Sequence, residues 1–124
     1  MMARAARRAL AVLAISTLAS SAFAADDATR CNRNGNQLEL NACAEQDYKA
    51  SDAKLNVRYK ALMASLSPDG QKALRDEQRA WLKQRDPGCR KRIEGLGSIA
   101  PLEYSACQME LTDQRVRQLE AKTR

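Results

Sequence analysis

The four cysteines are the residues of this 124-residue sequence with the clearest capacity for chemistry. They are Cys31, Cys43, Cys89 and Cys107. A thiol can act as a nucleophile, bind a metal or form a disulfide. A zinc site is disfavoured because the sequence has no Cys-x-x-Cys pair and no histidine. An even number of cysteines in a small exported domain instead predicts two disulfides.

Two pairings of these cysteines are open. Cys31–Cys43 with Cys89–Cys107 is favoured because it closes two short loops and needs no long-range pairing. Cys43–Cys89 with Cys31–Cys107 is the alternative, because the predicted fold brings all four sulfurs to one end. Closing a loop of 15–20 residues typically adds about 3 kcal/mol of stability to a small domain.

A set of charged residues is the second candidate site. Asp52 falls on the apolar stripe of a predicted helix, where a carboxylate needs a cation. Antiparallel packing of the predicted helices brings Asp52 level with Arg85 and Arg115, beside Trp81. We interpret Asp52, Arg85 and Arg115 as a structural ion pair that fixes helix register, and we expect Asp52→Ala to lower the melting temperature sharply.

The sequence lacks the usual residue patterns of catalysis. It has no histidine for general-base work, no Gly-x-Ser-x-Gly motif and no glycine loop that would hold a phosphate. The paired carboxylates Asp26-Asp27 and Asp76-Glu77 are expected to be solvated. The sequence therefore predicts no catalytic residues, no cofactor and no metal, and we expect a protein that is not an enzyme.

The first 24 residues have the pattern of a secretory signal peptide. Three arginines precede an apolar run over residues 10–18, which is too short to span a bilayer, and Ala-Phe-Ala at 22–24 fits a cleavage site. We therefore expect residues 25–124 to form one helical domain that is periplasmic or secreted, without stable membrane insertion.

The charge of the predicted mature chain is modest. Without the three leader arginines, eighteen basic and fifteen acidic side chains remain, a net charge of +3. Aromatic residues that could stack on bases are scarce and fall on helical stripes, so a nucleic-acid partner is not expected. The run Arg90-Lys91-Arg92 could meet acidic protein or lipid surfaces, but we interpret it as a solvated turn.

Three helices are expected to position these residues. Apolar side chains recur at steps of three and four from Leu38 to Leu66, and Ser67-Pro68-Asp69-Gly70 then reads as a turn. A second helix is predicted from about Gln71 to Arg85, ended by Asp86-Pro87-Gly88. A third starts near Pro101 and ends around Lys122.

The expected fold class is all-α. It is a three-helix antiparallel bundle, that is, a long helical hairpin plus a third helix, stapled by two disulfides. Asn36 is expected to cap the first helix, and Trp81 and Leu82 are expected on the inner face of the second. No alternating run is long enough to predict a strand.

Several motifs, in their order along the chain, resemble the lysozyme inhibitor LprI family. They are Leu40-Asn41-x-Cys43, then Tyr48, then Asp52-x-x-Leu55-Asn56-x-x-Tyr59, then Gln78-x-x-Trp81-Leu82-x-x-Arg85-Asp86-x-x-Cys89, then Gly97-Ser98, and finally Tyr104-x-x-Cys107-x-x-x-Leu111-Thr112-x-x-Arg115-x-x-x-Leu119. The resemblance implies a small exported helical domain of bacterial envelopes with a disulfide-bonded end. It also implies a protein partner, a lysozyme, whose inhibition protects peptidoglycan.

Two features depart from that family pattern. No cysteine directly follows the predicted cleavage site, so a lipid anchor is not expected here. The chain is also basic, as animal lysozymes are, and like charges oppose docking unless an acidic patch faces the partner.

The connection before the third helix is the predicted partner-binding segment. Residues 95–101 read Gly-Leu-Gly-Ser-Ile-Ala-Pro, a small and flexible stretch. We expect Ser98 to bond a catalytic carboxylate of lysozyme, beside Gly97, while Leu96 and Ile99 supply apolar contact. The plainer alternative is an ordinary interhelix connection. The alternative function is a periplasmic interaction, stress or toxin-neutralising protein with a non-lysozyme partner.

Overall fold

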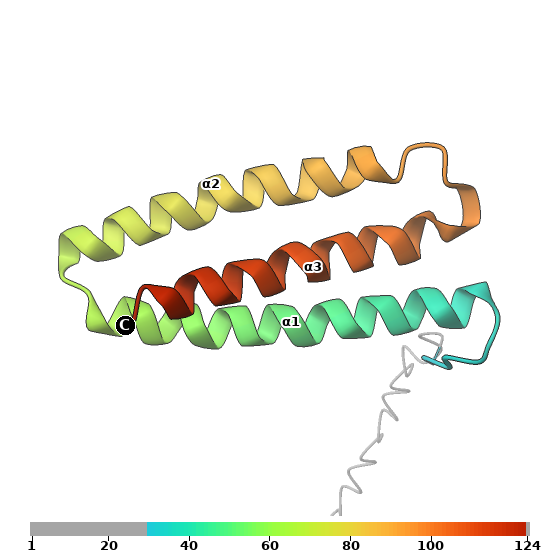
Figure 1. Cartoon of the computed structure of the whole chain (residues 1–124), viewed down its shortest axis with the longest axis horizontal. Coiled ribbons are helices and arrows are strands. Elements are labelled where there is room, and N and C mark those ends of the chain that lie inside the picture. The colour runs from blue at the N-terminus through green and yellow to red at the C-terminus, as the bar shows by residue number, and fades with distance from the viewer. Residues whose placement is uncertain (1–29, 124) are drawn as a thin grey trace, which may run out of the picture.

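The structure, a computed structural model, describes residues 30–123 and consists there of three long α-helices (Figure 1). They are α1 (Gln37–Ser65), α2 (Pro68–Arg92) and α3 (Ala100–Ala121), with a 3-10 turn η1 (Gly97–Ile99) before α3. No strand occurs among the described residues, so the predicted all-α class is confirmed.

The helices form an up-down-up arrangement. α2 runs antiparallel to α1, and α3 returns in the direction of α1 (Figure 1). α3 packs along α1 far more extensively than α2 packs on either helix. The molecule is therefore a tight α1–α3 pair with α2 laid beside it.

The N-terminus of α1 is fixed by a capping box. The Asn36 side chain accepts a hydrogen bond from the Glu39 N–H at 3.1 Å, and the Glu39 carboxylate accepts one from the Asn36 N–H at 2.8 Å. This reciprocal pair satisfies two backbone donors that a helix start leaves free. The predicted role of Asn36 is confirmed, and α1 starts one residue earlier than predicted.

α2 begins at Pro68, so the predicted four-residue turn over 67–70 is wrong. Ser67 is the N-cap, and its hydroxyl accepts a hydrogen bond from the Gly70 N–H at 3.3 Å. Proline fits the first helical turn because its missing N–H would have no intrahelical acceptor there. The Gln71 amide then donates to the carbonyls of Met63 and Leu66 at the end of α1, at 3.1 and 3.3 Å.

α2 also continues through Asp86-Pro87-Gly88 to Arg92, so the predicted break at Pro87 is wrong. Proline removes one backbone hydrogen bond and crowds the preceding turn. Tertiary bonds hold the helix across this defect. Asp86 accepts from Gln108 of α3 at 3.2 Å, and Cys89, which is fully buried, is bonded to Cys107.

The apolar core is small. Four leucines form it, Leu55, Leu62, Leu74 and Leu119, and partly buried side chains including Trp81 pack against them. Leu82, predicted to face inward, has 38% of its surface exposed. It lies one residue beyond the face of α2 that contacts the bundle, so that prediction is wrong.

The two disulfides are Cys31–Cys43 and Cys89–Cys107, which confirms the favoured pairing. All four cysteines are bonded. Cys31 and Cys43 bracket the start of α1, whereas Cys89 lies in the last turn of α2 and Cys107 in the second turn of α3. These element ends meet at one end of the bundle (Figure 1), so the disulfides close that end.

Two further expectations concern the signal peptide and membrane insertion. The signal peptide predicted over residues 1–24 lies outside the described residues. Within the described part, no helix is both long enough and apolar enough to cross a bilayer.

Replacing Pro87 with alanine is expected to stabilise the protein. The change restores an N–H donor inside α2 and removes the ring clash, and this outweighs the greater freedom that alanine gives the unfolded chain, so we expect a gain of about 2 kcal/mol. Chemical denaturation of the oxidised protein measures it. Gly88→Ala is the matched control: its Cβ would meet nothing within 4 Å, and a gain of about 1 kcal/mol is expected from helix propensity. If the Pro87→Ala variant were no more stable than the parent, Pro87 would not destabilise the folded protein and the prediction would be wrong.

Candidate functional site

The guanidinium of Arg85 forms the centre of a buried polar cluster. Its side chain is 5% exposed, and its three nitrogens bond three different groups. Nη1 donates to the Thr112 hydroxyl at 3.1 Å, Nη2 to the Tyr48 hydroxyl at 3.1 Å, and Nε to the Asp86 carboxylate at 2.8 Å. Because these partners come from α3, α1 and α2, one side chain connects all three helices.

Aromatic rings enclose the same cation. The Arg85 guanidinium carbon lies 5.3 Å from the centre of the Tyr48 ring and 5.0 Å from that of Trp81. Arg115 approaches the Trp81 ring as well, at 5.9 Å. The negative ring face attracts a cation, and this attraction strengthens where water is excluded. Trp81 therefore joins the two predicted arginines in one layer.

Asp52 is a secondary partner of Arg85. Its carboxylate lies 3.9 Å from Nη1 of Arg85 and its side chain is 40% exposed. The Asp86 carboxylate is closer, 2.8 Å from Nε of Arg85. From the sequence, Asp86 was expected only to help end a helix. An Asp beside an Arg on one helix does not normally face it, and no sequence pattern indicated that this pair would bond.

Arg115 bonds to Glu77 rather than to Asp52. Nη1 of Arg115 donates to Glu77 at 2.8 Å, Nε donates to Gln78 at 2.9 Å, and Lys122 contacts the other Glu77 oxygen at 3.0 Å. Arg115 Nη2 is buried without a hydrogen-bond partner among the described residues, and the Trp81 face lies beside this guanidinium. Glu77, expected to be solvated, thus holds two cations.

The acidic members of these clusters are held in their charged form. Hydrogen bonding to Arg115 lowers the pKa of Glu77, with a further contribution from Lys122. Burial alone would raise the pKa of Asp86, but the hydrogen bonds from Arg85 and Gln108 outweigh it and the pKa is lowered. Burial raises the pKa of Tyr48, so its hydroxyl remains a neutral hydrogen-bonding group.

The polar groups of the cluster are bonded to one another. Each carboxylate is bonded to an arginine, and the Tyr48 and Thr112 hydroxyls contact a permanent cation, not a base that could activate them. Within the described residues, no three His, Cys, Asp or Glu side chains are grouped so that they could hold a metal ion.

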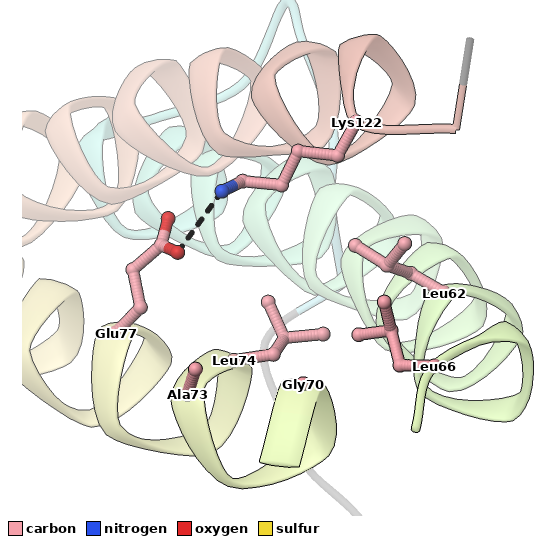
Figure 2. Close-up of a pocket in the computed structure, with 7 residues that line it drawn as sticks. All are labelled: Leu62, Leu66, Gly70, Ala73, Leu74, Glu77 and Lys122. Carbon is pink, nitrogen blue, oxygen red and sulfur yellow. Dashed lines mark hydrogen bonds and ion pairs between the residues drawn. The ribbon is translucent and has the colours of Figure 1, made fainter. Parts of the chain in front are cut away.

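A cavity of about 280 Å³ lies at the opposite end of the bundle from the disulfides (Figure 2). Its lining residues are Leu62, Leu66, Gly70, Ala73, Leu74, Glu77 and Lys122. Figure 2 shows the leucine side chains around an apolar hollow, with the Glu77–Lys122 ion pair at one side. The two charged groups bond each other, so the cavity presents little polar chemistry of its own.

The predicted binding segment is more ordered in secondary structure than expected. Residues 97–99 form η1, and Ala100 and Pro101 already belong to α3, so the segment is not an irregular loop throughout. Gly95 and Gly97 have φ of 79° and 61°, a region that glycine enters without strain. Leu96 is 37% and Ile99 41% exposed, and Ser98 is exposed between them.

Two exposed acidic residues flank this segment, and a run of three exposed basic residues, Arg90-Lys91-Arg92, ends just before it. Residues 93–114 contain four acidic side chains and no lysine or arginine. Glu94 precedes Gly95, and Glu103 lies in the first turn of α3, both exposed.

The other two acidic residues lie further along α3, where Glu110 pairs with Arg92 at 3.5 Å and Asp113 accepts a hydrogen bond from Ser51. Counting charge along the chain in windows would have revealed this acidic run, because the net positive charge of the whole sequence conceals it.

The family model described as lysozyme inhibitor LprI matches residues 28–119. This protein belongs to the LprI family. It is also similar to an uncharacterized protein of Rhizobium meliloti (strain 1021), 34% identical over 106 residues that cover 72% of this chain and 75% of that protein. No solved structure matches.

Residues of the family resemblance coincide with the Arg85 cluster. Tyr48, Trp81, Arg85, Asp86 and Thr112 all belong to the motifs on which the resemblance was based. In this LprI member they bond or stack on one another, and they are largely withdrawn from solvent. These five motif residues therefore hold the helices together, whereas Gly97 and Ser98, which are also motif residues, lie in the exposed segment before α3.

Removal of Arg85 is expected to destabilise the protein far more than removal of Asp52. Arg85→Ala leaves Asp86 and the Tyr48 and Thr112 hydroxyls without their partner, and we expect a loss of about 3–5 kcal/mol. Asp52→Ala removes a half-exposed carboxylate 3.9 Å away, so less than about 1 kcal/mol is expected, and the sharp effect expected from the sequence is revised. Denaturant titration of both variants measures the difference. Equal losses would place Asp52 at the centre of the cluster after all.

The Glu77–Arg115 bond is expected to make stability depend on pH. The folded protein lowers the pKa of Glu77 below its ordinary 4.5, so its stabilising contribution is present above that value and is lost as the pH falls through the folded pKa. Glu77→Gln should therefore be less stable than the parent at neutral pH, by no more than about 1 kcal/mol because Glu77 is part-exposed, and the difference should vanish in acid. Thermal melts across pH test this. Glu103→Gln, an exposed site on α3, is the control and should show no such convergence.

Proposed function

We propose that this protein binds a lysozyme and inhibits it by covering the substrate cleft with the segment Leu96–Ile99, hereafter the tip. The observation that carries the proposal is an exposed apolar tip, closed at its base by the Cys89–Cys107 disulfide, in a member of the lysozyme inhibitor LprI family. The chemistry is that of a binding protein, in which affinity comes from fit and charge.

The tip has the shape that entry into a cleft requires. Leu96 and Ile99 flank Ser98, and each keeps more than a third of its surface exposed. A Cβ at Gly97 would meet nothing within 4 Å, so this side of the tip is open. The Ser98 hydroxyl is available to bond a catalytic carboxylate, while the two apolar side chains contact the cleft walls.

The base of the tip is rigid. Cys89 and Cys107 are buried and joined, with their Cα atoms 5.7 Å apart, and η1 also contacts α1. A segment held in its bound conformation loses less entropy on association than a free loop does. This preorganisation supports binding by a short segment that otherwise offers few contacts.

Charge supports a basic partner for the tip. Glu94 and Glu103 flank it, and residues 93–114 contain no basic side chain. These two carboxylates attract a basic lysozyme locally, whereas the exposed run Arg90-Lys91-Arg92 repels one that approaches over the end of α2. Repulsion between two basic proteins is therefore reduced for an approach over Glu94 and Glu103.

The disulfides support an exported location, since such bonds persist in oxidising compartments. Together with the expected signal peptide over residues 1–24 and the domain over 25–124, they favour the periplasm or the exterior, where lysozyme acts on peptidoglycan.

The direct test measures lysis of bacterial walls by lysozyme in the presence of purified, oxidised protein. Leu96→Ala/Ile99→Ala removes both apolar contacts of the tip, and we expect inhibition to weaken about tenfold or more. Leu38→Ala/Val57→Ala is the matched control. It truncates two apolar residues of α1 that are more exposed than those of the tip, Leu38 at 62% and Val57 at 64%. The control should inhibit like the parent.

Each other outcome has a definite meaning. Full inhibition by the tip variant would assign lysozyme binding to another surface. No inhibition by the parent protein would overturn the proposed function and favour a non-lysozyme partner.

A further inference from the structure

The basic charge of this protein is concentrated on α2. This helix contains eight basic and four acidic side chains, whereas α1 has four of each and α3 has two basic and four acidic. All four charged residues between positions 93 and 114 are acidic. The excess positive charge is therefore a property of one helix and not of the whole surface.

Five of the basic residues on α2 lie along one line, which we call the α2 basic stripe. They are Lys72, Arg75, Arg79, Lys83 and Arg90. Steps of three, four, four and seven keep them within about 80° of helical arc, and the stripe is about 27 Å long. Four of the five are exposed and Arg75 is partly exposed.

The stripe faces away from the bundle. The side of α2 that packs on α1 and α3 contains Leu74, Trp81, Arg85 and Cys89, which are buried or partly buried. α2 forms one long side of the molecule, with α3 and α1 both on its other side (Figure 1). A flat partner can therefore reach the full length of the stripe.

Two acidic residues lie along the stripe, and Asp86 is already bonded to the buried Arg85. Asp76 contacts Lys72 at 2.7 Å and Arg79 at 4.0 Å. Arg75, Lys83 and Arg90 make no ion pair with any residue in the described part of the chain. Like charges three or four residues apart on a helix repel, so the stripe lowers the stability of α2 when nothing binds to it.

We infer that the α2 basic stripe binds the headgroups of anionic phospholipids at a membrane surface. A straight row of cations fits an extended anionic plane, where every basic side chain meets a phosphate at once. No aromatic residue that could stack on a base lies in the stripe, and the single leucine at its edge, Leu82 at 38% exposed, is too little to anchor the helix in the lipid tails. The association is therefore peripheral and electrostatic, and it does not depend on lysozyme binding at the tip.

Such binding has a characteristic dependence on lipid and salt. The attraction falls off within a Debye length, about 10 Å at 0.1 M ionic strength, so added salt weakens it. It needs net negative lipid and is absent on a zwitterionic surface.

Vesicle co-sedimentation tests the inference. The oxidised protein should partition onto vesicles of phosphatidylcholine and phosphatidylglycerol at low ionic strength. It should not partition onto vesicles of phosphatidylcholine alone, and high salt should release it. Arg75→Gln/Arg79→Gln/Lys83→Gln should weaken partitioning at least tenfold, because each basic residue near the surface adds to the attraction. This variant removes like-charge repulsion and should melt no lower than the parent.

The matched control is Lys49→Gln/Lys54→Gln/Lys60→Gln, which removes the same charge from exposed positions of α1. It should retain most of the partitioning, within about threefold of the parent. If both triple variants weakened vesicle partitioning equally, net charge alone would explain the binding and the proposal for the stripe would be overturned. No partitioning at low salt would overturn lipid binding, and so would tighter binding to duplex DNA than to the vesicles. Lysozyme inhibition by the α2 variant should stay unchanged, so the two proposals can fail separately.

Discussion

The buried guanidinium of Arg85 is the interaction on which the three-helix arrangement depends. A charge withdrawn from water is costly unless its hydrogen bonds are satisfied and a counter-ion is close. Asp86 supplies the counter-ion from the same helix, and Tyr48 and Thr112 supply acceptors from the other two. A change in the register of any helix would separate Arg85 from one of these groups, so the cluster specifies how the helices align.

The apolar core alone gives less specificity. Its four leucines leave a cavity where α1 and α2 join, and α2 makes few contacts with α1. Leucines tolerate sliding past one another better than directional hydrogen bonds do. The polar cluster in the middle and the disulfide at the far end therefore align α2, whereas the leucines mainly stabilise the α1–α3 pair.

The sequence predicted the features that depend on local chemistry. The three helices, the Asn36 cap and the cysteine pairing follow from residue type and spacing. The errors arise where distant contacts override a local rule. Pro87 is tolerated because the turn after it is bonded to α3. Asp52 was predicted as the partner of Arg85 and Arg115 because the position of a residue along a bundle was predictable, whereas rotation about each helix axis was not. Glu77 was missed as the partner of Arg115 for the same reason.

Charge is distributed unevenly over the surface of the molecule. Glu94 and Glu103 flank the tip at one end, and the α2 basic stripe extends along one side as far as Arg90, in the last turn of α2. A partner of either sign therefore meets a different part of the surface, and a total charge describes neither. Both surfaces are supported by the same buried arginine, because its bonds hold α2 against the helix that follows the tip.

The proline within α2 has a consequence for where the protein works. Beyond Pro87 the helix has lost one of its own hydrogen bonds, and Cys89 is the buried residue that secures its final turn. If that sulfur bond were reduced, the end of α2 and the tip would open together as one small unit, while the leucine core remained closed. Oxidation thus completes folding at the tip, so in a reducing compartment the end of α2 and the tip would be incompletely formed.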